Sequence, residues 1–210
     1  MPTALSDAYA TAAQYRTIVA STDSGDDTQI LEDLTVVSRY IDAKLGRENT
    51  GFSKDPNDAT RIFVAEAKSA ILYIDPLSAA PTSITVDLNG DGTFASAEAL
   101  VATDYELRPL NAVLRPEPWP YESIWLTPWG TLGRFGDGDR VQVIGKFGWP
   151  SIPARIKQAT IRLTAVLRLE SPMATERIPE ALEASFQASP LARSILHGLM
   201  DQYRAARFFA

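Results

Sequence analysis

The residues of this 210-residue chain with the clearest spacing for chemistry form an acidic, glycine-containing stretch. Asp87, Asn89 and Asp91 stand at alternate positions, Gly92 follows directly, and Glu98 comes six residues later. This spacing matches the calcium-binding loop D-x-[DN]-x-[DN]-G-x5-E at every specified position. Calcium prefers carboxylate and amide oxygens as ligands, so the four oxygen-bearing side chains, those of Asp87, Asn89, Asp91 and Glu98, are the candidate metal ligands.

The sequence before this loop favours a different explanation of the same residues. An EF-hand has a helix before its loop, whereas the segment 81–86 combines a proline with β-branched residues, as a strand does. Asn-Gly and Asp-Gly pairs also form tight β-turns, because these residues accept a positive φ. We therefore expect a β-hairpin turn here and no cofactor or dedicated metal, with incidental calcium binding as the alternative.

Other combinations of side chains that carry enzyme chemistry are missing from the sequence. It has no cysteine, which excludes disulfides, zinc–thiolate sites and cysteine nucleophiles. His197 is the only histidine, so multi-histidine metal sites are excluded, and we expect a structural or surface role for it. No serine stands in a G-x-S-x-G motif, and no G-K-[ST] of a phosphate-binding loop occurs. We predict that the protein is not an enzyme.

An aromatic cluster lies in a proline-rich stretch. Its members are Trp119, Tyr121, Trp125, Trp129 and Phe135. Exposed aromatic residues of this kind form platforms that bind carbohydrates or peptides. More often they cover the core of a small β domain, which is what we expect here, with packing between protomers as an alternative.

The last residues of the sequence combine two arginines with two adjacent phenylalanines. A basic helix end complements the helix dipole, which is one explanation. Adjacent phenylalanines at the end of a helix are also suited to docking on a partner, which is the other. The candidate partner-binding residues are Tyr203, Arg204, Arg207, Phe208 and Phe209.

The composition is that of an ordinary globular protein, with 45% hydrophobic and 22% charged residues. The formal net charge of −6 argues against nonspecific binding to nucleic acid or to an anionic membrane, for which a basic surface supplies the affinity. No apolar run approaches the roughly 20 residues of a membrane span, and the first residues lack the pattern of a signal peptide. We expect a product of the cytoplasm with no membrane partner.

Hydrophobic periodicity predicts helices in the first part of the chain and strands in the middle. A weak helical pattern covers 4–20, and a stronger one ends at Gly46, with Asp26 and Gln29 at capping-box spacing. The apolar face of that second helix consists of Ile30, Leu34, Val37, Ile41 and Leu45. Alternating patterns between turn signals predict strands at 61–64, 71–74, 83–88, 104–108, 123–126 and 140–147.

Helical periodicity returns after Ser151. One helix has its apolar face on Ile156, Ala159, Leu163, Val166 and Leu167. Residues 171–188 remain unassigned, and Ser189-Pro190 has the form of a cap at the start of a last helix. The apolar face of the last helix is predicted at Leu191, Ile195, Leu199 and Tyr203.

The predicted fold class is α+β, a helical framework with an inserted antiparallel β domain. One N-terminal helix and two C-terminal helices make up the framework. The expected divisions are 1–58 for the N-terminal helical part, 59–150 for the β domain and 151–210 for the C-terminal helical part.

Several segments, taken in order, resemble the head-to-tail connector (adaptor) family of tailed double-stranded DNA phages and related particles. The first is a helix ending in Gly46-Arg47 before the aromatic Phe52, and another is a strand, a Gly148-Trp149-Pro150 corner and a helix. The matching segments are 38–52, 84–93, 103–111, 148–169 and 189–204. Residues 171–188 depart from the family's pattern.

This resemblance implies a structural protein of the virion. Such adaptors form a ring, usually of twelve copies, beneath the portal and join the DNA-filled head to a stopper or tail-terminator protein, with DNA passing through the lumen. The implied partners are copies of the chain itself, the portal and the stopper or tail-terminator. The implied location is the virion neck, after synthesis in the host cytoplasm.

Two further expectations follow from the resemblance. The segment 191–210 docks on the portal, with Phe208 and Phe209 as apolar anchors and Arg204 and Arg207 at the rim. The β domain faces a neighbouring copy or the tail. The alternatives are another neck component, which would be mainly β, and a calcium-binding β interaction module.

Overall fold

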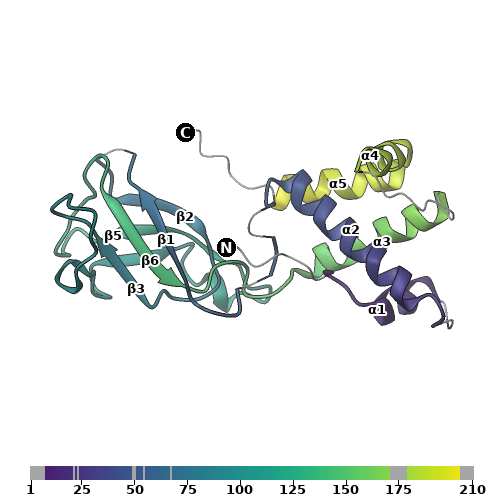
Figure 1. Ribbon diagram of the computed structural model, residues 1–210, viewed down its shortest axis with the longest axis horizontal. Helices are drawn as coiled ribbons and strands as arrows, with labels where there is room; N and C mark the ends of the chain where they lie inside the picture. The colour runs from purple at the N-terminus through teal and green to yellow at the C-terminus, as the bar shows by residue number, and fades with distance from the viewer. Residues whose placement is uncertain are drawn as a thin grey trace. The chain divides into compact units, whose positions relative to one another are not determined.

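The computed structural model describes residues 8–20, 22, 24–48, 51–53, 55–66, 68–170 and 179–203. It divides into two compact units (Figure 1). Met1–Phe52 and Ile152–Ala210 together form the helical unit, and Ser53–Ser151 form the β unit. The predicted α+β class is confirmed, because strands occupy the middle of the chain and helices occupy both ends.

Five helices make up the described part of the helical unit. They are α1 (Ala12–Val19), α2 (Asp27–Leu45), α3 (Ala154–Glu170), α4 (Pro179–Ala188) and α5 (Pro190–Tyr203). Helix α3 contacts each of the other four, so it is the centre of this unit. Helix α1 lies within the weak helical pattern predicted over 4–20, although the predicted framework counted only one N-terminal helix. Helix α4 is an addition to that framework and occupies part of the segment that the sequence left unassigned.

The apolar faces predicted for α2 and α3 form the core of the helical unit. All ten residues are buried: Ile30, Leu34, Val37, Ile41, Leu45, Ile156, Ala159, Leu163, Val166 and Leu167. Gly46 ends α2 in the left-handed conformation, with a φ of 67° that suits glycine.

The capping box predicted at the start of α2 is wrong. The side chain of Asp26 makes no capping hydrogen bond there. Its carboxylate instead accepts a hydrogen bond of 2.9 Å from Nη2 of Arg168 on α3. A charged donor from a neighbouring helix has taken the oxygen that the local motif would have used.

The start of α5 was predicted correctly, and Leu199 and Tyr203 of its predicted apolar face are buried, but the prediction is wrong for Leu191. The Ser189 hydroxyl accepts a hydrogen bond of 3.4 Å from the Ala192 amide, and Pro190 is the first helical residue. The buried side chains of α5 include Ala192 and Leu199, whereas Leu191 is 54% exposed. Each step of four residues over-rotates an α-helix by about 40°, so a stripe drawn through successive fourth residues drifts off the buried face.

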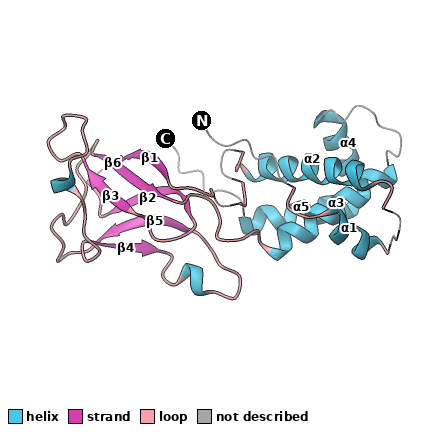
Figure 2. Cartoon of the chain, turned by 60° about the horizontal axis from the view of Figure 1, so that its bottom comes forward, coloured by secondary structure: helices cyan, strands magenta, loops and turns pink. Residues whose placement is uncertain are grey.

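Six strands in the β unit form two antiparallel sheets of three strands each. The first sheet has the order β1 (Ala59–Val64), β6 (Arg140–Gly145), β3 (Ser83–Val86), and the second has the order β2 (Ile71–Leu77), β5 (Tyr121–Leu126), β4 (Tyr105–Arg108). Figure 2 shows them side by side in magenta. Each predicted strand is present, with ends that differ by a few residues.

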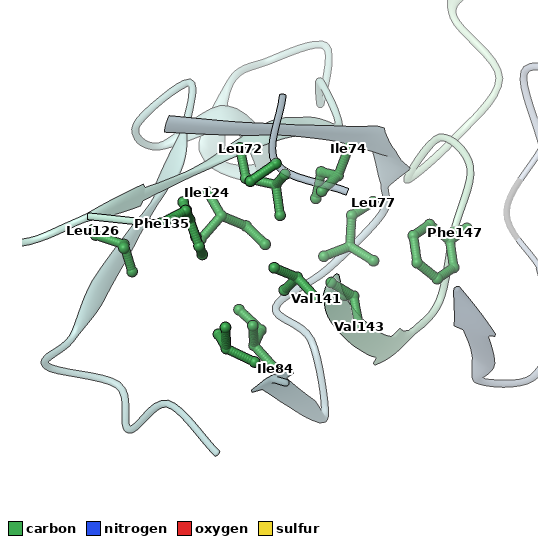
Figure 3. Packing of buried hydrophobic residues seen from close by; sticks show 12 residues of the cluster. Leu72, Ile74, Leu77, Ile84, Ile124, Leu126, Phe135, Val141, Val143 and Phe147 are labelled. Atoms are coloured by element: carbon green, nitrogen blue, oxygen red, sulfur yellow. The ribbon is translucent and has the colours of Figure 1, made fainter. Parts of the chain in front are cut away.

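Side chains from both sheets meet in one hydrophobic core (Figure 3). Leu72 and Ile124 come from the second sheet, whereas Ile84, Val141 and Val143 come from the first. Because successive side chains of a strand point to opposite faces, each sheet gives one apolar face to this core.

Substitution of Leu163 tests the central position of α3. Leu163→Ala should lower the free energy of unfolding by about 2–5 kcal/mol, because its fully buried side chain would leave a cavity. Urea denaturation followed by far-ultraviolet circular dichroism measures this loss. Leu169→Ala, on the same helix but 81% exposed, is the matched control and should change stability by no more than about 0.5 kcal/mol. Equal effects of the two substitutions would contradict the assigned packing.

Candidate functional site

The segment of α2 that carried the family resemblance builds a buried polar cluster. Asp42 is 1% exposed, and the Tyr9 hydroxyl donates a hydrogen bond of 2.6 Å to its Oδ1. The same hydroxyl accepts a hydrogen bond of 2.9 Å from the Phe52 amide. Nη2 of Arg39 lies 3.3 Å from the second carboxylate oxygen, which gives the buried charge an opposite partner. The cluster joins segments before α1 and after α2 to the end of α2 itself.

Arg47, directly after Gly46, ties the end of α5 to the end of α2. Its Nε donates a hydrogen bond of 2.8 Å to the carbonyl oxygen of Tyr203. Its guanidinium lies 5.5 Å from the centre of the Phe52 ring, and that ring meets the Tyr203 ring edge-on at 5.7 Å. The last carbonyls of a helix have no partner within the helix, so an arginine side chain is well suited to bind one.

This arrangement assigns Tyr203 an anchoring role in place of the predicted partner contact. Its side chain is only 1% exposed, because the helical unit encloses the ring. The other candidate partner-binding residues, Arg204, Arg207, Phe208 and Phe209, lie outside the described residues. The buried cluster therefore fixes the end of α5 at Tyr203.

A second polar cluster holds α4 on α2. Glu183 accepts hydrogen bonds from the Tyr40 hydroxyl at 2.7 Å and from Nε2 of Gln187 at 2.8 Å, and Nζ of Lys44 lies 2.5 Å from its carboxylate. The hydrogen bond from Lys44, followed by that from Tyr40, lowers the pKa of Glu183 to about 2. This carboxylate stays ionised at neutral pH and positions α4.

The calcium-like loop follows strand β3 and not a helix, as expected, but the predicted β-hairpin is wrong, because β3 pairs with β6 and not with the next strand. Its chain returns to β3, where Ala99 forms an isolated bridge with Thr85. Gly90 and Gly92 have φ values of 73° and 81°, which explains the glycines at these positions. Within the described residues, no group of three or more histidine, cysteine, aspartate and glutamate side chains is arranged to hold a metal ion.

The side chains of this loop bind its own backbone amides. Oδ2 of Asp87 accepts from Gly92 at 3.0 Å, and Oδ1 of Asn89 accepts from Asp91 at 2.9 Å. Oδ1 of Asp91 accepts from Thr93 at 2.7 Å. Glu98 accepts from the amides of two loop residues, Leu88 at 3.3 Å and Ala95 at 3.1 Å. The motif residues are thus brought together in one ordered loop.

The aromatic cluster is only partly in the core. Phe135 is fully buried, and the Trp119 ring packs against Trp149 with 4.5 Å between centroids, as expected for core residues. Trp125 is 38% exposed and Trp129 is 75% exposed, so the expectation of a core role is wrong for these two. Trp125 is the exposed residue of β5 between the buried Ile124 and Leu126, and Trp129 follows the strand.

His197 lies on the surface of α5. Its Nδ1 is 3.3 Å from the Asp201 carboxylate one turn later, and both side chains are well exposed. This agrees with the surface role expected for it. Among the helices that the structure describes, none is long and apolar enough to cross a membrane.

The buried Asp42 predicts a pH dependence of stability. Burial raises the pKa of Asp42 to about 6, against 3.8 for an ordinary aspartate, so between these values the native state holds a proton that the unfolded chain releases. The contribution of Asp42 to stability therefore falls as pH rises through this window. The stability of Asp42→Asn relative to the natural protein should rise by about 2–3 kcal/mol from pH 4 to pH 7.

Urea denaturation at both pH values measures this difference. Asparagine keeps an oxygen that can accept the Tyr9 hydrogen bond, so the comparison isolates the charge. Leu169→Ala, which removes no titratable group, is the control and should differ from the natural protein equally at both pH values. If the stability difference between Asp42→Asn and the natural protein does not change with pH, the raised pKa of the buried Asp42 carboxylate is contradicted.

Comparison with known proteins was made on sequence and on structure. No protein-family model matches the chain, and no curated protein matches it. Its fold is similar to that of a chain in the neck of an empty GTA particle, computed with C6 symmetry. The two are 18% identical, the match covers 95% of this chain and 91% of that chain, and the TM-score is 0.51.

A chain in the virion of a native gene transfer agent (GTA) particle also matches, with 19% identity, the same coverage of 95% and 91%, and a TM-score of 0.46. The similarity to the neck chain concerns the whole architecture, helices and strands together. The chain thus shares its fold with a chain from the neck of a GTA particle, and this shared fold supports its resemblance to the head-to-tail connector family.

Proposed function

We propose that this protein is a head-to-tail adaptor of the virion neck. It forms a ring beneath the portal and joins the DNA-filled head to the stopper or tail-terminator protein, with DNA passing through the lumen. The observation that carries this proposal is the fold shared, over nearly the whole chain, with a protein from the neck of a GTA particle. The order of segments that resembles the connector family supports the same role.

The chemistry of the chain supports a structural role that leaves passing DNA free. Its formal net charge is −6, and an acidic lumen repels the phosphate backbone. A closed ring requires each copy to bind two neighbours through two different surfaces. The C6 symmetry used for the neck of the similar particle supports a ring with a multiple of six copies, and twelve meets this condition.

We place the contact with the portal in the C-terminal segment. Arg47 and Phe52 hold the carbonyl and ring of Tyr203, so the last described residue of α5 is firmly anchored. Phe208 and Phe209 are suited to apolar pockets on the portal, because buried aromatic residues contribute much of the binding energy of interfaces. The exposed Trp125 and Trp129 leave the β unit available for a neighbouring copy or a tail-side partner.

Electron microscopy of the purified protein mixed with the portal protein of the same genome tests the adaptor role. We expect a ring of additional density on the outer end of the portal. If both proteins are folded and no ring forms, the adaptor role is wrong. Binding to a tail component alone would instead assign the chain to another position in the neck.

The double variant Phe208→Ala/Phe209→Ala tests the portal contact. Its affinity for the portal should fall by about 30-fold or more, as expected when two anchor residues of an interface are truncated. Binding is measured by surface plasmon resonance, and the melting temperature should not change. Leu114→Ala, which removes a 78% exposed apolar side chain from the β unit, is the matched control and should bind normally. Unchanged affinity of the double variant would show that the contact lies elsewhere.

A further inference from the structure

We propose that the loop 87–98 of the β unit binds a calcium ion, a property separate from the adaptor role. The loop has the calcium-binding pattern at every specified position, from Asp87 to Glu98. Each of the four candidate side chains carries an oxygen, and no nitrogen or sulfur ligand is present among them. A set of oxygen donors is what calcium prefers.

An unpaired oxygen of Asp87 is the independent observation that points to a cation. The Asp87 side chain belongs to a residue that is only 4% exposed, and its Oδ2 accepts the Gly92 amide across the loop. Its Oδ1 is buried, and no hydrogen-bond donor among the described residues reaches it. Buried carboxylate oxygens almost always have a hydrogen-bond donor or a metal as partner. A calcium ion in the loop would supply the missing partner.

The remaining ligands are available although they already accept hydrogen bonds. An ionised carboxylate has about four acceptor sites. Oδ1 of Asp91 accepts from the amide and the hydroxyl of Thr93, and its Oδ2 accepts only from the Asn89 amide group, so Oδ2 keeps capacity for an ion. Asn89 and Asp91 are exposed, which allows an ion to enter from solution. Glu98 must turn inward from the amides of Leu88 and Ala95, because the described acidic side chains are not yet gathered as in a metal site.

This rearrangement sets the expected strength and selectivity of binding. A site that must reorganise binds weakly, so we expect a dissociation constant of about 10⁻⁴–10⁻³ M, as in the weaker natural calcium loops. Magnesium requires strict octahedral geometry at short distances and gives up its water reluctantly, so it should bind less well. The expected ligand is therefore calcium.

Titration of the full chain with calcium chloride, followed by calorimetry and by amide chemical shifts, tests the proposal. We expect saturable binding and shifts confined to loop amides such as those of Gly90, Gly92 and Thr93. Asp91→Asn and Glu98→Gln each keep the shape of the side chain and one acceptor oxygen, so the loop should still fold. Each should weaken calcium binding by about tenfold or more.

The matched control is Asp137→Asn. Asp137 lies in the other Gly-Asp-Gly turn of the β unit, is exposed, and loses the same charge on substitution. It should leave calcium affinity within about twofold of the natural value, since exposed charges at a distance are screened by salt.

Three results would overturn the proposal. The first is that calorimetry detects no heat of binding and no amide shifts move up to about 10 mM calcium. The second is that Asp137→Asn weakens calcium binding as much as Asp91→Asn or Glu98→Gln does. The third is that magnesium produces the same amide shifts at the same concentration as calcium. The portal experiment is carried out without calcium, so failure of the calcium site leaves the adaptor role to its own test.

Discussion

The packing of α2 against α3 and α5 is the constraint on which the rest of this structure depends. These helices come from opposite ends of the chain, and the whole β unit is inserted between them. Helix α2 alone cannot bury its apolar stripe, because α1 covers only part of it. The helical unit therefore forms only when the C-terminal helices return to α2, and closing the long loop between them costs conformational entropy.

Two buried carboxylates make this packing specific. Asp33 is fully buried and its Oδ2 lies 2.9 Å from Nη1 of Arg168, so α2 and α3 pack in one register. Asp42, near the other end of α2, instead ties the segment before α1 to α2 through Tyr9 and pairs with Arg39 on α2 itself. Removing one partner of such a pair leaves a buried charge, which is strongly destabilising, whereas the intact pair adds little net stability. These buried pairs therefore favour one arrangement of the chain over others and add little to the free energy of unfolding.

The β unit differs from the helical unit, since apolar side chains of both sheets form its core. Val141 and Val143 of β6 lie on the face of the first sheet that packs in the core. Ile62 on the neighbouring strand β1 is 47% exposed. A sheet with one face on the core and one face open can offer that open face to a partner. A protein that joins several others in a neck would need such surfaces, whereas the helical unit supplies the anchored end of α5.

Local sequence patterns predicted most of the secondary structure. The stripe from Ile30 to Leu45 and the alternation in each strand were sufficient to place α2 and all the strands, because periods of 3.6 and 2 are properties of the chain itself. The ends of elements were less certain. Asp26 was predicted as a cap but bonds to Arg168, a residue distant in sequence that no local window contains.

The sequence by itself determined the fold class, the apolar faces, the turn glycines and the calcium-like pattern, since each depends on neighbouring residues. Only the tertiary structure decided that Asp42 is a buried acid, that Arg47 holds the carbonyl of Tyr203, and that Trp129 is exposed. Asp42 stands beside Ile41 on a helix that also carries surface acids, and nothing local distinguishes it from them. Burial and long-range hydrogen bonds depend on which segments meet, and that is a property of the packed chain.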